Sequence, residues 1–190
     1  MTVEVEFFYD YVSVYSYIAN SQLATLGGAE ISFRPMLLGA VMQATGNRPP
    51  GAVPAKGAYL TTDVERWVQR YALPFESNPL FPQNTLKALR LSLVARRHGK
   101  FDAVHEALFA AMWQEQRNLE SLDVLRGIAA TVSVPIDEIE DPAIKGELKS
   151  NTDEAVARGA FGAPTFFVGE QMFFGNDRLE FVKEALADRG

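Results

Sequence analysis

The chain has 190 residues, of which 47% are hydrophobic and 22% are charged, as is usual for a soluble globular protein with a substantial core. Its 18 basic and 24 acidic residues give a net charge of −6, which argues against nucleic acid and anionic membranes as partners because both attract basic surfaces. No cysteine is present, so the protein itself can supply no disulfide, no thiolate nucleophile and no cysteine metal ligand.

Metal binding and membrane insertion are not expected either. The two histidines, His98 and His105, lie seven residues apart on a predicted helix, which is a poor arrangement for a metal site. The N-terminal sequence MTVEVEFFYD lacks the basic start of a secretory signal, and no apolar run approaches the ~20 residues that span a bilayer. We therefore expect a cytoplasmic protein.

Strand, helix and strand patterns follow one another at the N-terminus. Residues 3–9 alternate apolar and acidic side chains, residues 13–26 place apolar side chains at helical spacing, and residues 30–36 form a second strand pattern. Gly27 and Gly28 end the helical pattern. The helix between the strands is long enough for a right-handed crossover that makes the two strands parallel.

The central part of the chain is predicted to be helical. A loop rich in glycine and proline at 45–54 is followed by predicted helices at 59–71, 84–98, 101–115, 121–131 and 142–158. Asp141 and Pro142 are typical of a helix start, an N-cap followed by proline at the first helical position. Gly99 and Gly159 occupy positions typical of glycines that follow a helix.

Strand patterns return after Gly159, at 164–168 and 171–174, before a last helix at 178–187. Without the helical block, the order is βαβ followed by ββα, which resembles the thioredoxin-like arrangement. We therefore predict an α/β fold in which residues 1–40 plus 160–190 form a discontinuous thioredoxin-like domain. Residues 41–159 are predicted to form an inserted, all-helical domain.

Ser13 lies between the first strand and the first helix. Its simplest role is that of an N-cap, whose side-chain oxygen accepts a backbone hydrogen bond. In a thioredoxin-like fold the same turn holds the reactive group, at a helix N-terminus that favours anions. A serine hydroxyl there could donate to a bound thiolate, and the two roles are compatible.

Pro164 directly precedes a predicted strand. An arbitrary X-Pro bond is cis in only about 5% of cases, but a thioredoxin-like fold places a cis proline here, facing the first helix. The amide and carbonyl of Ala163 would then be available to an extended peptide, as in strand addition. The alternative is an ordinary trans proline in a turn.

Asn176, Asp177 and Glu180 lie at the start of the last predicted helix. The Asp177-x-x-Glu180 spacing matches a capping box, and helix capping alone could explain these residues. The alternative is a ligand site, in which free backbone amides bind a carboxylate and Asp177 pairs with an ammonium group.

Other polar residues have simpler interpretations. Arg34 and Lys56 are isolated cations, typical of solvated surface, and Asn84 is predicted to cap the following helix. His105 and Phe109 recur at a spacing of four, which predicts side chains that face the core or a neighbouring helix.

Several longer segments together resemble the 2-hydroxychromene-2-carboxylate isomerase family, a thioredoxin-fold group related to kappa-class glutathione transferases. They are FFYDYVSVYSYIA at 7–19, RPMLLGAVMQATGN at 34–47, VPAKGAYLTTDVERW at 53–67, FPQNTLKALR at 81–90, TDEAVARGAFGAPTFFVG at 152–169 and FFGNDRL at 173–179. The last two are the most specific, and the resemblance covers nearly the whole chain.

The resemblance implies a glutathione cofactor that is neither consumed nor conjugated in the net reaction. Ser13 would be catalytic, since it would donate a hydrogen bond to the glutathione sulfur. Ala163, beside Pro164, would pair its backbone with the cysteinyl part of glutathione. The γ-glutamyl end would be held by Asn176, Asp177 and Arg178.

The implied reaction converts an aromatic substrate, 2-hydroxychromene-2-carboxylate, by thiolate addition, ring opening, bond rotation and elimination. The relatives also imply a homodimer. The chain departs from the family pattern at two positions: Val14 replaces a common proline, and Met42 replaces a lysine found in the helix after the second strand of some members. Lys56 and Asn84 are therefore the candidate substrate-binding residues.

Two other functions stay open. A kappa-class-like glutathione transferase would conjugate glutathione to small electrophiles and consume its thiol. A non-enzymatic thioredoxin-fold binding module would bind its ligand without turnover. Disulfide oxidoreductase chemistry, which other thioredoxin-fold proteins carry out, is excluded because it requires protein cysteines.

Overall fold

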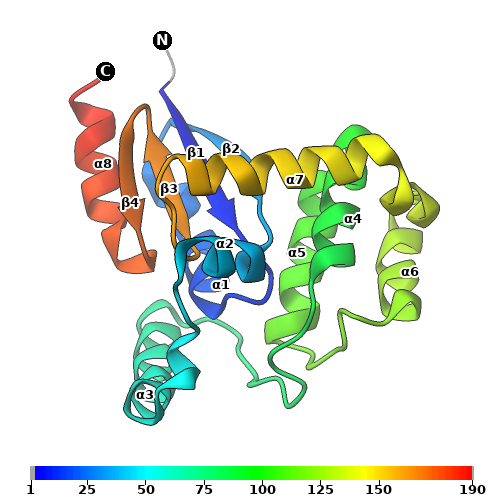
Figure 1. Ribbon diagram of the computed structural model, residues 1–190, viewed down its shortest axis with the longest axis horizontal. Coiled ribbons are helices and arrows are strands. Elements are labelled where there is room, and N and C mark those ends of the chain that lie inside the picture. Colours follow the sequence, from blue (N-terminus) through cyan, green and yellow to red (C-terminus); the bar gives the residue numbers. More distant parts are fainter. Residues whose placement is uncertain (1–2, 190) are drawn as a thin grey trace.

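A four-stranded sheet joins the two ends of the chain in the computed structural model, which describes residues 3–189 (Figure 1). The strands are β1 (Glu4–Tyr9), β2 (Glu30–Pro35), β3 (Thr165–Val168) and β4 (Gln171–Phe174), in the order β2-β1-β3-β4. β1 is parallel to β2 and antiparallel to β3, and β3 is antiparallel to β4. This topology confirms the predicted thioredoxin-like fold.

The helices are α1 (Val14–Asn20), α2 (Leu38–Thr45), α3 (Pro54–Tyr71), α4 (Leu86–Arg97), α5 (Phe101–Trp113), α6 (Leu122–Thr131), α7 (Pro142–Ala157) and α8 (Leu179–Ala187). The helix predicted at 13–26 ends early and continues as a 3-10 helix, Leu23–Leu26. Ser21 explains the break, because its hydroxyl donates to the Ile18 carbonyl at 2.7 Å and so competes with the helix. α3 begins five residues before the predicted 59, with Pro54 at its first position.

The two faces of the sheet bury different sets of side chains. Because side chains alternate along a strand, Val5 and Phe7 of β1 point into the larger core, with residues of α1, α5 and α8. Phe8 points into a smaller core on the other face, with residues of α2 and α7. The sheet is therefore covered by helices on both faces.

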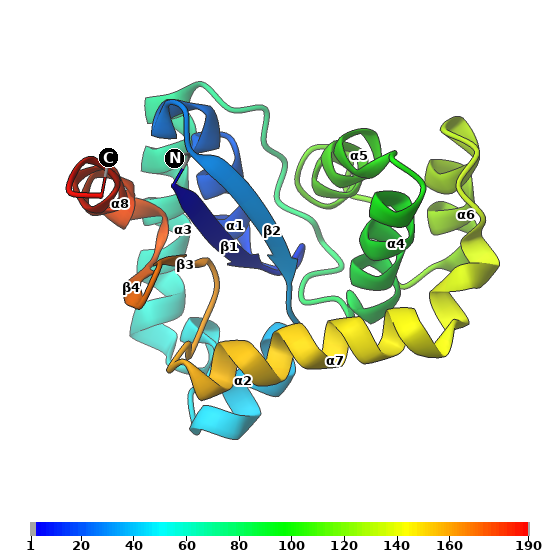
Figure 2. The ribbon, with the colours of Figure 1, turned by 90° about the horizontal axis from the view of Figure 1, so that it is seen from above.

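α7 connects the helical block to the sheet. Its first residues lie beside α4, and its last residues lie beside β2 and α2 (Figure 2). Asp141 caps its start by accepting from the Ala143 amide at 2.8 Å, as predicted. Since α7 contacts both parts of the molecule, the division into residues 1–40 plus 160–190 and residues 41–159 stays a prediction.

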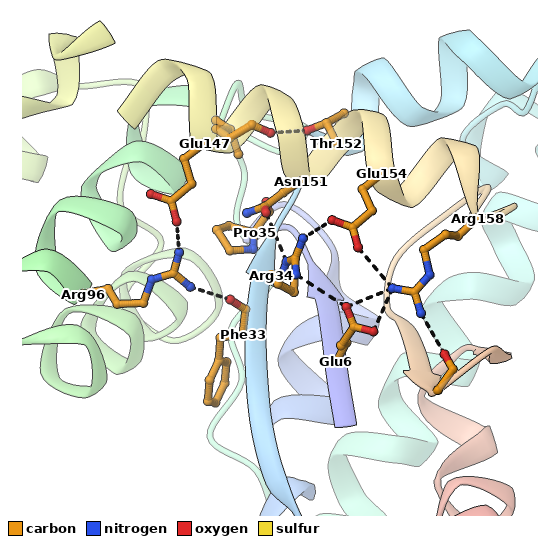
Figure 3. A network of polar contacts seen from close by, with 12 residues as sticks. Glu6, Phe33, Arg34, Pro35, Arg96, Glu147, Asn151, Thr152, Glu154 and Arg158 are labelled. Atoms are coloured by element: carbon orange, nitrogen blue, oxygen red, sulfur yellow. Dashed lines mark hydrogen bonds and ion pairs between the residues drawn. The ribbon is translucent and has the colours of Figure 1, made fainter. Parts of the chain in front are cut away.

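A network of ion pairs connects the C-terminal half of α7 to β1 and β2 of the sheet (Figure 3). The Arg158 guanidinium donates to both carboxylate oxygens of Glu6, at 2.7 and 2.9 Å, and Arg34 lies 3.5 Å from the same carboxylate. Arg34 also pairs with Glu154 and donates to the Asn151 side chain at 3.1 Å. The prediction that Arg34 is an isolated, solvated cation is wrong, because Asn151 and Glu154, more than a hundred residues away along the chain, are among its partners.

Glu6→Gln should lower the free energy of unfolding by about 2 kcal/mol, because it leaves two largely buried guanidinium groups with one carboxylate fewer. The reference is Asp123→Asn, which breaks the exposed pair with Arg126 and should cost less than about 0.5 kcal/mol. Urea unfolding of the two variants at pH 7 measures the difference. Equal losses in both would show that the network contributes no more than a surface ion pair.

His105 lies in the larger core, as its spacing predicts, and is 3% exposed. Its Nδ1 lies 2.9 Å from the Tyr11 hydroxyl, and its Nε2 lies 2.9 Å from the Asn20 side-chain oxygen. Because an amide oxygen only accepts hydrogen bonds, Nε2 carries the hydrogen and Nδ1 accepts from Tyr11. Burial lowers the pKa of His105 to about 3, so the ring stays neutral at physiological pH.

Candidate functional site

A cavity of about 1250 Å³ lies between the thioredoxin-like part of the molecule and α3. Its wall combines the turn after β1, the start of α2, the loop at 46–53, one side of α3, the segment at 81–85 and the segments at 161–163 and 174–177. Among the predicted site residues, those that line it are Ser13, Lys56, Asn84, Ala163, Asn176 and Asp177. Pro164 and Arg178 are adjacent in sequence to lining residues but are not part of the wall.

Ser13 is the N-cap of α1, as one of its two interpretations predicts. Its backbone is extended, with φ −86° and ψ 110°, and its side-chain oxygen accepts from the Ser16 amide at 3.1 Å. Its hydroxyl donates to the carbonyl of Ala163 at 3.0 Å, although the two residues are 150 positions apart. The fold thus brings together the two residues that the sequence singles out from opposite ends of the chain.

The Ala163–Pro164 peptide bond is cis, as the thioredoxin-like fold predicts. The Pro164 carbonyl accepts from the Gly175 amide at 3.0 Å, and Thr165 donates to the Gly162 carbonyl at 2.8 Å. A β-carbon at Gly162 would lie 2.7 Å from the Phe174 ring, so any larger residue would have to displace that ring. These contacts hold the backbone of Ala163 at the cavity wall.

The capping-box interpretation of Asp177 and Glu180 is wrong. A 3-10 turn, Asn176–Arg178, precedes α8, and Arg178 is the N-cap of that helix with no side-chain capping bond. Asp177 pairs with Arg178 instead, and Glu180 pairs with Lys183 at 2.7 Å. Because the Asp177 carboxylate caps no helix and lines the cavity, it is available to interact with a bound ligand.

Asn176 carries a donor without a protein partner. The residue is 5% exposed, and its Nδ2 has no hydrogen-bond partner among residues 3–189. A buried donor without a partner is costly, and Asn176 belongs to the cavity wall, where a bound ligand could supply an acceptor. An amide donor beside the Asp177 carboxylate fits the carboxylate and ammonium groups of an amino acid end, as in glutathione.

Asp10 is a site residue that the sequence prediction missed. Its carboxylate is 1% exposed and lines the cavity directly before the Ser13 turn. It accepts from the Val12 and Leu38 amides at 3.1 and 2.9 Å and from the Thr85 hydroxyl at 2.5 Å. Burial raises its pKa, and these hydrogen bonds oppose that effect. The available signal was an aspartate at the end of the apolar strand in FFYD, where a solvated acid is the usual expectation.

A further part of the cavity wall is formed by side chains of α3 and α1. The Tyr15 hydroxyl donates to Asp63 at 2.7 Å, and Tyr59 donates to the other oxygen of Asp63 at 3.4 Å. The pKa of Tyr15 is raised well above its usual value, mainly by burial and also by the hydrogen bond to Asp63. Trp67 and Leu60 add apolar surface from α3. This half of the cavity suits a flat, apolar ligand.

Two cations line the cavity, Lys56 in the first turn of α3 and Arg48 in the preceding loop. Arg48 was not singled out from the sequence, because an arginine in a loop is usually solvated. Met42 also lines the wall, so the position where some relatives place a lysine is apolar here. The prediction that Asn84 caps the following helix is wrong by one position, because Thr85 is the N-cap of α4. The Asn84 side chain lies just before the cap and accepts from the Leu86 amide at 3.0 Å.

Between residues 3 and 189, no three histidine, aspartate or glutamate side chains are grouped as metal ligands would be. Over the same residues, none of the helices combines the length and the apolar character that crossing a bilayer demands.

Comparison with known proteins relates the chain to two named enzyme groups. A 2-hydroxychromene-2-carboxylate isomerase from Sphingobium xenophagum is 32% identical over 197 residues, covering 99% of this chain and 100% of that protein. Glutathione S-transferase kappa 1 from Caenorhabditis elegans is 29% identical, covering 96% and 90% of the two chains.

Among solved structures, a 2-hydroxychromene-2-carboxylate isomerase superposes with a TM-score of 0.85 and 26% identity, covering 97% of this chain and 95% of that one. The cytosolic disulfide reductase DsbM from Pseudomonas aeruginosa superposes with a TM-score of 0.69 and 17% identity over 98% and 96% of the chains, which shows a shared fold only. The model of the DSBA-like thioredoxin domain matches residues 4–187. The chain therefore belongs to the DSBA-like thioredoxin family, among the relatives that include 2-hydroxychromene-2-carboxylate isomerases and kappa-class glutathione transferases.

Proposed function

We propose that the protein is a glutathione-dependent isomerase acting on 2-hydroxychromene-2-carboxylate or a closely related aromatic-degradation intermediate. The observation that carries this proposal is the hydrogen bond from Ser13 to the Ala163 carbonyl within a large cavity. It joins a hydroxyl donor at a helix start to a backbone edge that can pair with a peptide. The similarity to named isomerases supports the same function.

The size of the cavity supports binding of two small molecules together. Pockets for a single small ligand usually measure about 300–1,000 Å³, and this cavity measures about 1250 Å³. Glutathione would lie along Ala163, Asn176 and Asp177, and the substrate would lie against the aromatic side chains of α3. Lys56 and Arg48 are the cations available to hold a substrate carboxylate in that half.

When bound, glutathione would supply a thiolate that adds reversibly to the conjugated substrate. A thiol of pKa ~8.5 is only about 3% ionised at pH 7, and lowering that pKa by two units requires about 2.7 kcal/mol of thiolate stabilisation. Ser13 would contribute by donating its hydroxyl hydrogen to the sulfur. Because that hydroxyl has a single hydrogen, it would exchange the Ala163 carbonyl for the sulfur as its acceptor.

The decisive assay follows the ultraviolet absorbance of 2-hydroxychromene-2-carboxylate with the purified protein, with and without glutathione, while free thiol is counted. We expect isomerisation that requires glutathione and leaves the thiol count constant. No turnover under both conditions would remove this substrate from the proposal.

A kappa-type glutathione transferase is the second candidate, supported by the 29% identity to the nematode enzyme over 96% of this chain. In the same assay, a thiol count that falls as substrate disappears would favour the transferase. A third possibility, a non-enzymatic binding module, would bind glutathione but turn over no electrophile.

Asp177→Asn should weaken glutathione binding about tenfold, because it removes the carboxylate proposed to pair with the ammonium group of the γ-glutamyl end. The melting temperature should change little, since Asp177 caps no helix. The matched control is Glu180→Gln, which neutralises an exposed carboxylate on α8 and should leave binding intact. Calorimetric titration with glutathione measures both variants, and equal affinities would remove Asp177 from the binding site.

A further inference from the structure

Three separate segments of the cavity wall converge on the carboxylate of Asp10. Its Oδ1 accepts from the Val12 amide and the Thr85 hydroxyl, and its Oδ2 accepts from the Leu38 amide. Leu38 is the first residue of α2, and Thr85 is the N-cap of α4. One buried side chain thus ties the turn after β1 to the starts of two helices that lie far from it in the sequence.

The turn that Asp10 stabilises is the one that carries Ser13. The Asp10 carbonyl accepts from the Ser13 amide at 3.0 Å, and its carboxylate accepts from the Val12 amide within the same turn. The orientation of this turn therefore decides where the Ser13 hydroxyl points. Among the side-chain hydrogen bonds of residues 3–189, those of Asp10 alone link the Ser13 turn to both α2 and the start of α4.

The chemistry of these contacts demands a carboxylate. Two N–H groups and one O–H group all donate to Asp10, and an ionised carboxylate is a pure acceptor. An asparagine of the same shape would place its own N–H₂ group against one of these donors. A buried network with one such conflict loses its defined geometry.

We propose that Asp10 is a positioning residue, whose buried carboxylate sets the direction of the Ser13 hydroxyl by locking the Ser13 turn against α2 and Thr85. The inference rests on the proposed function, because its effect is measured as the ionisation of the thiol of bound glutathione. Asp10 would act through Ser13, without touching the cofactor itself.

The test is a pH titration of the ultraviolet absorbance of the glutathione thiolate, with glutathione saturating the wild-type protein, Asp10→Asn, Thr85→Val and Thr85→Ser. Thr85→Val keeps the shape of the side chain and removes the hydroxyl, whereas Thr85→Ser retains the hydroxyl. The other charged side chains of the cavity, unchanged in every variant, are Arg48, Lys56, Asp63 and Asp177.

We expect the midpoint of thiolate formation to rise by about one pH unit in Asp10→Asn and in Thr85→Val, a tenfold loss of the ionised form below the midpoint. Thr85→Ser should restore the wild-type midpoint. The direction separates positioning from electrostatics, because removal of a nearby negative charge would by itself lower the midpoint.

Two results would overturn the inference alone. One is a midpoint that falls in Asp10→Asn, and the other is an unchanged midpoint in Thr85→Val with a lower melting temperature, which would mean a purely structural role. If Asp10→Asn does not fold, the two Thr85 variants decide. A wild-type protein that binds no glutathione would overturn the proposed function and this inference together.

Discussion

Ser13→Ala is expected to lower glutathione-dependent turnover about 100-fold while it changes glutathione affinity by no more than about threefold. The loss reflects one charge-assisted hydrogen bond to the thiolate, which is worth about 1.5–3 kcal/mol and is needed most as the sulfur gains charge. The variant should remain folded, with a melting temperature about 2–4 °C lower, because an N-cap contributes about 1 kcal/mol. Steady-state kinetics, calorimetric titration and thermal unfolding measure the three quantities.

The chain offers a matched control for this experiment. Ser121 is also an N-cap serine, and its side chain accepts from the Val124 amide at the start of α6, away from the cavity wall. Ser121→Ala should therefore lose similar stability and no turnover. If the two variants lose turnover equally, the effect of Ser13→Ala comes from stability. If Ser13→Ala keeps full turnover, Ser13 has no part in the reaction.

Acid should destabilise the fold through His105. In the folded protein its pKa is about 3, whereas an unfolded chain has a histidine pKa of about 6.5. Between these pKa values the unfolded state binds a proton that the folded state excludes. The free energy of unfolding is therefore fully retained above pH 6.5 and decreases as the pH falls below it. The loss is about 1.4 kcal/mol per pH unit, or about 3 kcal/mol between pH 7.5 and pH 4.5.

The measurement compares the pH dependence of urea unfolding in wild type and His105→Gln. The variant starts less stable, because it disturbs the contacts with Tyr11 and Asn20, but its stability should fall less steeply below pH 6.5. Acidic groups, including Asp10, whose pKa is raised by burial, are present in both proteins and cancel in the difference. His98→Gln, at an exposed helix end, controls for the loss of a histidine. Parallel pH profiles for wild type and His105→Gln would contradict the expectation.

The fold could be predicted largely because its signals are local. Strand alternation at 3–9, the Asp141-Pro142 helix start and the glycines after α4 and α7 each follow from short-range physical chemistry, and the structure has all of them. The place of Ser13 at the start of a helix and that of Pro164 before a strand came from the same reasoning. Their meeting across 150 residues followed from the element order, because a thioredoxin-like sheet brings those segments together.

The features that were missed depend on distant partners. Arg34 looks solvated in the sequence because Glu6 and Glu154, which pair with it, lie on another strand and on α7. Asp10 looks like an ordinary acid after a strand until the fold supplies Leu38 and Thr85 as donors. The capping box failed for a different reason: a 3-10 turn shifts the start of α8 past Asp177, and no pattern of residue types marks that shift.

The strand order determines when the sheet can be completed during synthesis of the nascent chain. β1 pairs on one side with β2, which follows it closely, and on the other side with β3, where Phe7 is opposite Phe166. During synthesis, α4, α5 and α6 leave the ribosome before β3 exists, so they can pack on one another while β1 still lacks its second neighbour. Closing so distant a contact is slow. The pairing of Ser13 with Ala163 is therefore expected to be among the last events of folding. A chain released before its final strands would contain the residues of α1 to α7 but would lack α8 and the part of the cavity wall at 174–177.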